Sequence, residues 1–176
     1  MTSFPQHPLH IYLLNASADI YNDHRYSLRK ATLADAQLYF HWINNPEYKN
    51  LSGRDIFISW DSHLSTFSSN LQSDSHLMLL FLFDEQVVGQ ISFALANSSW
   101  SVGYHIDSAY RRRGFGRKLV ILGLAYLLNS CQGHLPSFTA KVKHNNHSSL
   151  KILESLGFHR KESLCQSMFL EYVLHF

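Results

Sequence analysis

The chain has 176 residues, of which 45% are hydrophobic and 14% aromatic. This is enough apolar material for one packed domain, and it excludes a disordered chain. The formal net charge is only +2, so the whole protein is not a general binder of polyanions and any basic function must be local.

Signals for disulfides, membranes and metals are weak. Two cysteines, Cys131 and Cys165, are too few for a disulfide framework, and we expect reduced thiols. No apolar run approaches the length of a membrane span, and the first residues lack a basic leader. The 12 histidines are scattered, without His-Glu-x-x-His or Cys-x-x-Cys spacing. We therefore expect a cytoplasmic protein with no metal site and no membrane partner.

The periodicity of the sequence predicts one domain behind a short extension. Residues 1–25 show no clear period and are expected to form an irregular N-terminal extension, followed by a single domain over residues 26–176. Thr32 and Asp35 have the spacing of a capping box, and Gly157 that of a helix C-cap. In chain order we expect a strand at 26–31, helices at 32–45 and from Ser59, strands at 76–83, 86–95 and 100–107, a helix at 117–130, a strand at 137–144, a helix at 146–158 and a strand at 167–176. This order favours one mixed α/β or α+β domain.

One stretch, "AYRRRGFGRKL" from Ala109 to Leu119, concentrates basic residues and glycines at the start of an expected helix. A dinucleotide fingerprint would need a third glycine where Leu119 stands, so that interpretation fails. A nucleic-acid site would need more basic surface and stacking aromatics, and we expect no nucleic-acid partner. A solvated basic helix start is disfavoured, because each cation at a helix N-terminus costs a few tenths to about 1 kcal/mol unless an anion binds there.

A phosphate cradle explains this composition best. Gly114 and Gly116 let the backbone approach an anion closely. The helix N-terminus adds its partial positive charge, and arginines add directed donors with a permanent charge. Such a loop suits a pyrophosphate.

Two motifs then carry a resemblance to a known family. R-x-x-G-x-G at Arg111–Gly116, after "GYHID" and before a helix, resembles the coenzyme A pyrophosphate loop of the GNAT N-acetyltransferase superfamily. "NHSSLKILESLGF" resembles the helix that follows in that family. The resemblance implies a GNAT-like acyl-CoA N-acyltransferase fold, of the α/β (α+β) class, with a mixed central sheet of about six to seven strands flanked by about four helices.

The resemblance also implies acetyl-CoA as co-substrate, without a metal. Backbone groups of the expected fourth strand would bind the pantetheine arm, the amides of the basic loop would hold the pyrophosphate, and the start of the following helix would face the cofactor. The cofactor-binding residues expected in this way are Tyr104, His105, Ile106, Arg111, Arg112, Arg113, Gly114, Phe115, Gly116, Arg117, Lys118, Asn146 and Ser149.

Two departures from the family pattern affect the catalytic residues. Many members have a tyrosine acid where this chain has Leu153. Ser149 lies where the ribosomal-protein N-terminal acetyltransferases carry a serine near the sulfur, and it is our candidate acid; the alternative is a small residue that allows close packing. Many members have a glutamate where this chain has Ser101, which makes His105 or a water chain the candidate base.

The absence of that glutamate bears on the acceptor. A lysine amine, with a pKa of about 10.4, needs a strong base at neutral pH, whereas an α-amine at about 7.7–8.0 or an amine on a sugar ring does not. "LRKATLADAQLYFHWINNPEYKN" with "IFISWDSHLSTF" resembles the amino-sugar-nucleotide N-acetyltransferases of pseudaminic acid and flagellin glycan synthesis, although Ile43 replaces their usual arginine. Trp42, Asn44 and His63 are the candidate acceptor residues that this resemblance implies; the alternative is a structural role as core aromatics and helix caps.

Three functions follow from these observations. The first is an N-acetyltransferase that acts on a small-molecule amine, with an amino-sugar nucleotide as the expected acceptor. The second is a protein N-terminal α-amine acetyltransferase, and the third is a non-catalytic acyl-CoA-binding or sensing domain. We expect a monomer or a homodimer.

Overall fold

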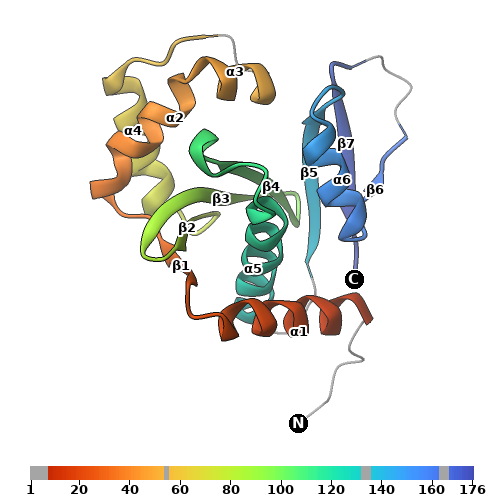
Figure 1. Ribbon diagram of the computed structural model, residues 1–176. Helices are drawn as coiled ribbons and strands as arrows, with labels where there is room; N and C mark the ends of the chain where they lie inside the picture. Colours follow the sequence, from red (N-terminus) through yellow and green to blue (C-terminus); the bar gives the residue numbers. More distant parts are fainter. Residues whose placement is uncertain (1–7, 54–55, 132–135, 163–166) are drawn as a thin grey trace.

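Apolar runs, continuous in some strands and alternating in others, build one sheet in the computed structural model, which describes residues 8–53, 56–131, 136–162 and 167–176 (Figure 1). The strands lie in the order β1-β2-β3-β4-β5-β7-β6. Their bounds are β1 (Tyr26–Lys30), β2 (His76–Phe83), β3 (Gln86–Ala96), β4 (Ser99–Ile106), β5 (Ser137–Lys143), β6 (His159–Arg160) and β7 (Phe169–Leu174). The predicted mixed sheet is confirmed. Strand β6 was not predicted, because two residues are too few to show an alternating pattern.

The sheet opens between β4 and β5. These neighbours are the parallel pair of a sheet whose other pairs are antiparallel. They pair only through Ser99–Ser101 with Ser137–Thr139. Beyond those residues β4 continues to Ile106 and β5 to Lys143 without pairing to each other. Backbone groups of both strands are therefore free to bind something placed between them.

One face of the sheet is covered by a helix that is apolar on most sides. This helix, α5 (Phe115–Ser130), buries ten residues, among them Leu119, Leu122 and Leu128. It lies close to β3, since a Cβ added at Gly123 would stand 2.7 Å from Ile91 Cδ1. The second helix on this side, α6 (His147–Ser155), packs beside α5 and buries Leu153, the residue in the family's usual tyrosine position.

The opposite face carries a second, smaller core. Two helices, α2 (Ala36–Asn44) and α4 (Trp60–Gln72), pack Tyr39, Trp42 and Phe67 against Leu80 of β2. The predicted capping box is present, because Thr32 N donates to Asp35 Oδ2 at 2.8 Å. The capping box holds a single 3-10 turn at Leu33–Asp35. The predicted helix at 32–45 therefore begins regular α geometry only at Ala36.

The prediction of an irregular N-terminal segment is wrong for the residues the structure describes. Pro8–Asn22 form a helix, α1, which lies across the end of α5 at the bottom of Figure 1. Leu13 is fully buried in the main core and Ile20 is nearly so. The buried residues Leu13, Ser17 and Ile20 are spaced four and three apart, a helical period that exposed Ile11, Tyr12 and Tyr21 hide in the sequence.

The predicted helix end at Asn44-Asn45-Pro46 is confirmed, since α2 ends at Asn44, but a short helix that follows at once, α3 (Pro46–Ser52), was missed. Asn45 also caps this second helix, accepting hydrogen bonds from Glu47 N and Tyr48 N, with Pro46 in the first turn. The structure therefore has six α-helices over the described ranges, rather than about four. None of them is long and apolar enough to cross a membrane. Cys131 has a free thiol, and Cys165 lies outside the described residues.

Candidate active site

A cavity of about 780 Å³ occupies the opening between β4 and β5. Four parts of the chain surround it: α3, the divergent ends of β3, β4 and β5, the turn that leads into α5, and the start of α6. The lining includes Glu47, Tyr48, Gln90, Tyr104, His105, Ile106, Arg111, Arg112, Gly114, Phe115, Gly116, Arg117, Lys141, Asn146, Ser149 and Ile152. The structure thus brings together eleven of the thirteen expected cofactor residues; Arg113 and Lys118 are the two that do not line the cavity.

The basic loop connects β4 to α5, and two of its residues have backbone conformations with positive φ. Gly114 is the N-cap of α5 with φ of 77°, and Arg112 also has a positive φ of 62°. Phe115 anchors the loop in the main core, 4% exposed and packed on Tyr26 and Phe83. At Gly114 an added Cβ would meet nothing within 4 Å, so its backbone is open to a ligand.

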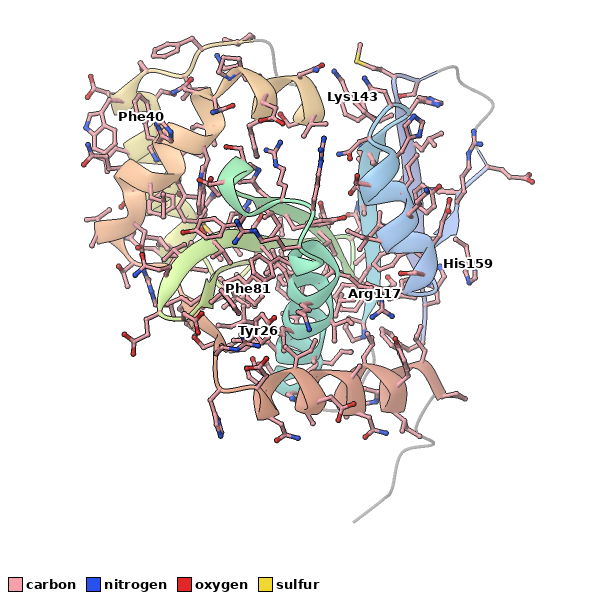
Figure 2. All side chains as sticks on the ribbon, viewed as in Figure 1. Tyr26, Phe40, Phe81, Arg117, Lys143 and His159 are labelled. Atoms are coloured by element: carbon pink, nitrogen blue, oxygen red, sulfur yellow. The ribbon has the colours of Figure 1, made fainter. Side chains whose placement is uncertain are left out.

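The cations of the loop are held in different directions. Arg111 donates from Nε to Ile106 O at 3.0 Å and from Nη1 to Glu47 of α3. Arg117 donates to Tyr12 of α1 and to Ser155 of α6, and Figure 2 labels it where α5 and α6 meet. Lys118 lies over the Tyr26 ring, and Arg113 over the Tyr110 ring. The loop therefore offers backbone amides first, and only some of its five cations face the cavity.

Two hydroxyl groups meet at the start of α6. Ser149 Oγ lies 2.7 Å from Tyr104 OH, across the gap between α6 and β4. Asn146 caps the helix and accepts from Ser149 N at 3.3 Å, which fixes the position of Ser149. Burial raises the pKa of Tyr104 to about 12, and the bond to Ser149 opposes that shift only in part. The phenol therefore keeps its proton at neutral pH and can donate it in a hydrogen bond.

His105 is a buried, neutral imidazole on the face of β4 that packs against α2 and α3. Its ring packs against Trp42 at 5.3 Å and against Tyr48 at 5.0 Å between centroids. Burial lowers the pKa of His105 to about 4, and Arg111 acts in the same direction, while Asp107 opposes them. At pH 7 the ring is unprotonated, available as a base but a weak one.

The three expected acceptor residues lie outside the cavity lining. Trp42 Nε1 donates to Asp107 Oδ2 at 2.8 Å, and its ring stands behind His105. Asn44 bonds both the N–H and the C=O of Ile58. His63 is buried, with Nε2 at 2.8 Å from Ala36 O. In this structure all three side chains hold together the layer of α2 and α4 behind the acceptor side.

Acceptor-side residues that sequence reasoning missed come mainly from α3 and β3. Glu47 and Tyr48 line the cavity from α3, and Gln90 lines it from β3. The cap-and-proline signal of α3 was present at Asn45-Pro46 and could have placed Glu47 and Tyr48 on a helix. Gln90 had no signal, because a polar residue on a strand is expected at an exposed face. The described residues hold no group of three or more His, Cys, Asp or Glu that could bind a metal ion.

The sequence matches the acetyltransferase (GNAT) domain family over residues 25–159. The chain belongs to the GNAT acetyltransferases. Comparison with curated protein sequences finds no significant match. The GNAT family makes acetyl-CoA the co-substrate of this enzyme and N-acetyl transfer its reaction, as the two motifs implied.

Solved structures share the GNAT fold at low sequence identity. Spermidine N-acetyltransferase from Vibrio cholerae, in complex with CoA and spermine, has a TM-score of 0.77 at 15% identity, over 86% of this chain and 95% of its own. A Salmonella typhimurium acetyltransferase that modifies the N-terminal serine of a 50S ribosomal subunit protein has a TM-score of 0.68 at 17% identity, over 85% and 94%. The N-acetyltransferase PseH from Campylobacter jejuni has a TM-score of 0.62 at 21% identity, over 85% and 97%. These likenesses concern the fold.

Proposed function

We propose that this GNAT enzyme transfers the acetyl group of acetyl-CoA to the amine of an amino-sugar nucleotide. The proposal rests on the observation that the candidate base in the cavity lining, His105, is a weak one. His105, with a pKa of about 4, cannot deprotonate an amine with a pKa of about 10.4, but it suffices beside an amine that is already partly neutral at pH 7. Amines on sugar rings meet that condition.

Charge around the cavity supports the same acceptor. Among its described lining residues Glu47 is the only carboxylate, and it is paired with Arg111. A polyamine with several positive charges would find no unpaired partner there. Lys141 of β5 lines the cavity and alternates with the buried residues Ala140 and Val142. We assign Lys141 to an anionic group of the acceptor, such as the diphosphate of a sugar nucleotide.

The lining residues fit acetyl-CoA. The backbone at Gly114 is open, which leaves room for a pyrophosphate. At Gly116 a Cβ would stand 3.0 Å from Ile152 Cδ1, so the absence of a side chain keeps space for the arm that follows the pyrophosphate. Acetyl-CoA supplies a thioester carbonyl that an amine can attack. The amine forms the new C–N bond, the C–S bond breaks with its electron pair on sulfur, and the proton that nitrogen loses is balanced by the one that the leaving thiolate takes up to become the thiol of CoA.

The chain's own groups assist in three places. The amides of the loop hold the phosphates, and backbone groups of Tyr104, His105 and Ile106 orient the arm in the opening beside β4. We propose Ser149 as the acid that protonates sulfur. Tyr104 positions it, because a phenol that keeps its proton can donate to Ser149 Oγ and leave the Ser149 hydroxyl hydrogen free.

A second acceptor class is a protein N-terminal α-amine. Its pKa of about 7.7–8.0 suits the same weak base. Ser149 also lies at the position where the ribosomal-protein N-terminal acetyltransferases carry a serine near the sulfur. Lys141 favours the sugar nucleotide over this alternative, because an α-amine peptide brings no obligatory phosphate. A cytoplasmic location and a monomeric or homodimeric assembly stay predictions.

The test is thiol release from acetyl-CoA in the presence of UDP-linked amino sugars, peptides with a free N-terminal serine or methionine, and spermidine. We expect turnover with a UDP-amino sugar. Lys141→Ala should raise the KM for that sugar at least tenfold, while Lys151→Ala on the exposed side of α6 serves as the matched control. Turnover only with peptides would replace the proposed acceptor. Tight acetyl-CoA binding without turnover of any amine would favour a non-catalytic sensor.

A further inference from the structure

One polar side chain in the cavity wall has no visible reason to be there. Gln90 of β3 is only 8% exposed, and its Oε1 is buried without a hydrogen-bond partner in the described parts of the chain. Folded proteins rarely bury a polar group in this way, because the group loses its bonds to water and gains none in return. A leucine or methionine at this position would avoid that cost. An unpartnered amide kept in a cavity wall points to a ligand.

The position of Gln90 identifies which end of the ligand it faces. Gln90 and His105 are directly opposite each other in the β3–β4 pair, so their side chains lie next to each other on one face of the sheet. This is the face of Trp42 and Tyr48, which pack on the His105 ring. On the other side of Gln90 its cross-strand partner is Leu80, which is fully buried and offers no polar atom. Among the described residues the Tyr39 hydroxyl is the other buried side-chain atom without a hydrogen-bond partner, but Tyr39 does not line the cavity. The Gln90 amide can therefore meet a ligand from the cavity that Gln90 and His105 both line.

The loop amides, where we expect the phosphates to bind, come from another part of the cavity lining. The pyrophosphate loop follows β4 at Arg111–Gly116, whereas Gln90 stands on the side of α2 and α3. Gln90 is thus a group of the acceptor end of the cavity. Oε1 is buried in this structure, and rotation of the terminal amide about its last side-chain bond turns the oxygen toward the cavity.

We infer that Gln90 binds the acceptor amine, its amide oxygen accepting an N–H of the nitrogen that attacks the thioester. The inference rests on the proposed function in that it needs an amine acceptor, but it holds for either amine class. Gln90 takes no proton. As the C–N bond forms, the nitrogen becomes positively charged and its N–H groups become stronger donors, so the bond to Gln90 is tighter in the transition state than in the bound substrate. His105 beside it is a base, whereas Gln90 is a neutral acceptor that sets the direction of the lone pair.

The decisive variant is Gln90→Met, which keeps the length of the side chain and removes its polar end. We expect a melting temperature equal to or above that of the unaltered protein, since an unpartnered buried group is lost. The Kd for acetyl-CoA should stay within twofold, while kcat/KM for the acceptor amine falls at least tenfold. Gln86→Met makes the same change at an exposed position of the same strand and should alter none of these values. Gln90→Glu, which retains an acceptor oxygen, should keep more activity than Gln90→Met.

Two results would overturn the inference. A melting temperature lowered by several degrees in Gln90→Met would show that the amide stabilises the folded protein itself. An unchanged kcat/KM for the acetylated amine would show that the amide does not touch the acceptor. The assay uses each amine of the panel above, so peptide turnover in place of sugar turnover refutes the proposed acceptor and still tests Gln90.

Discussion

The two ends of the cavity are built in different ways. At the end where we propose that the cofactor binds, the lining includes one continuous segment, Arg111–Gly116, whose backbone is shaped by two positive-φ residues. At the proposed acceptor end the lining consists of side chains from α3, β3, β4 and β5, brought together only by the tertiary fold. A backbone site leaves a short local pattern in the sequence, and an assembled site does not. This contrast sets what each region can tolerate.

The largest effect is expected from a change in the backbone site. Gly116→Val should weaken acetyl-CoA binding about a thousandfold, or about 4 kcal/mol, because its Cβ would stand 3.0 Å from Ile152 Cδ1 and its methyl groups would enter the cavity beside Tyr104. Isothermal titration calorimetry measures the Kd. Gly114→Ala is the companion variant: its Cβ meets nothing within 4 Å, so it should cost about 1–2 kcal/mol of stability through backbone strain and at most about tenfold in affinity. Equal affinities in the two variants would contradict the cradle.

The next effect concerns pH and the acceptor end. The pKa of His105 is about 4 in the folded protein and about 6.5 in an unfolded chain. As pH falls the unfolded chain binds this proton first, so the free energy of unfolding should fall by up to about 3 kcal/mol between those two values. Urea unfolding at a series of pH values measures it. His105→Phe keeps a ring against Trp42 and should flatten that slope; an identical slope in both proteins would show that His105 is not buried and neutral.

A smaller loss is expected where the two ends meet, at the sulfur. Ser149→Ala should lower kcat about a hundredfold, the low end of the range for a general acid, with little change in the KM for acetyl-CoA. Tyr104→Phe removes the hydroxyl 2.7 Å from Ser149 Oγ and should lower kcat about tenfold. Stopped assays at saturating substrates give these values. If Tyr104→Phe lost more than Ser149→Ala, the roles of the two hydroxyls would be reversed.

The smallest effect is expected behind the acceptor end. Trp42→Phe removes the bond from Nε1 to Asp107 Oδ2 and should cost about 1 kcal/mol of stability, with a few-fold loss of acetyl-CoA affinity. Trp60→Phe, at a side chain that is 39% exposed, should change stability by about 0.5 kcal/mol or less. Chemical denaturation compares the two. If Trp42→Phe changed neither the free energy of unfolding nor the affinity for acetyl-CoA, α2 would not support the basic loop.

How much of this could be predicted from the sequence follows the same contrast. The sheet, α5, α6 and the basic glycine turn before α5 were predictable, because apolar strand runs, an apolar helix and glycines at fixed spacing are local signals. Helix α1 was missed since Ile11, Tyr12 and Tyr21 are exposed apolar residues that blur its period. Gln90 was missed because its significance is the absence of a partner, a property that only the folded structure defines.

Trp42, Asn44 and His63 teach a related lesson. The sequence pattern around them indicated an acceptor site, and the structure places each one in a bond that holds backbone or a neighbouring carboxylate. The residues of a motif shared with a group of enzymes can thus support a site structurally without contacting its ligand. The side chains that line the cavity from this region, Glu47 and Tyr48, follow immediately after the motif's Asn-Pro.

Two polar bonds cross from the acceptor side to the loop: Trp42 to Asp107, and Glu47 to Arg111. The first joins α2 of the small core, and the second joins α3, to the turn that precedes α5. A shift of either helix relative to that turn would break the half-buried Trp42–Asp107 bond or the exposed Glu47–Arg111 pair. With the two substrates bound as we propose, the distance between thioester and amine would be set when the chain folds. We therefore expect the resting enzyme to align the two substrates with little further ordering at each turnover.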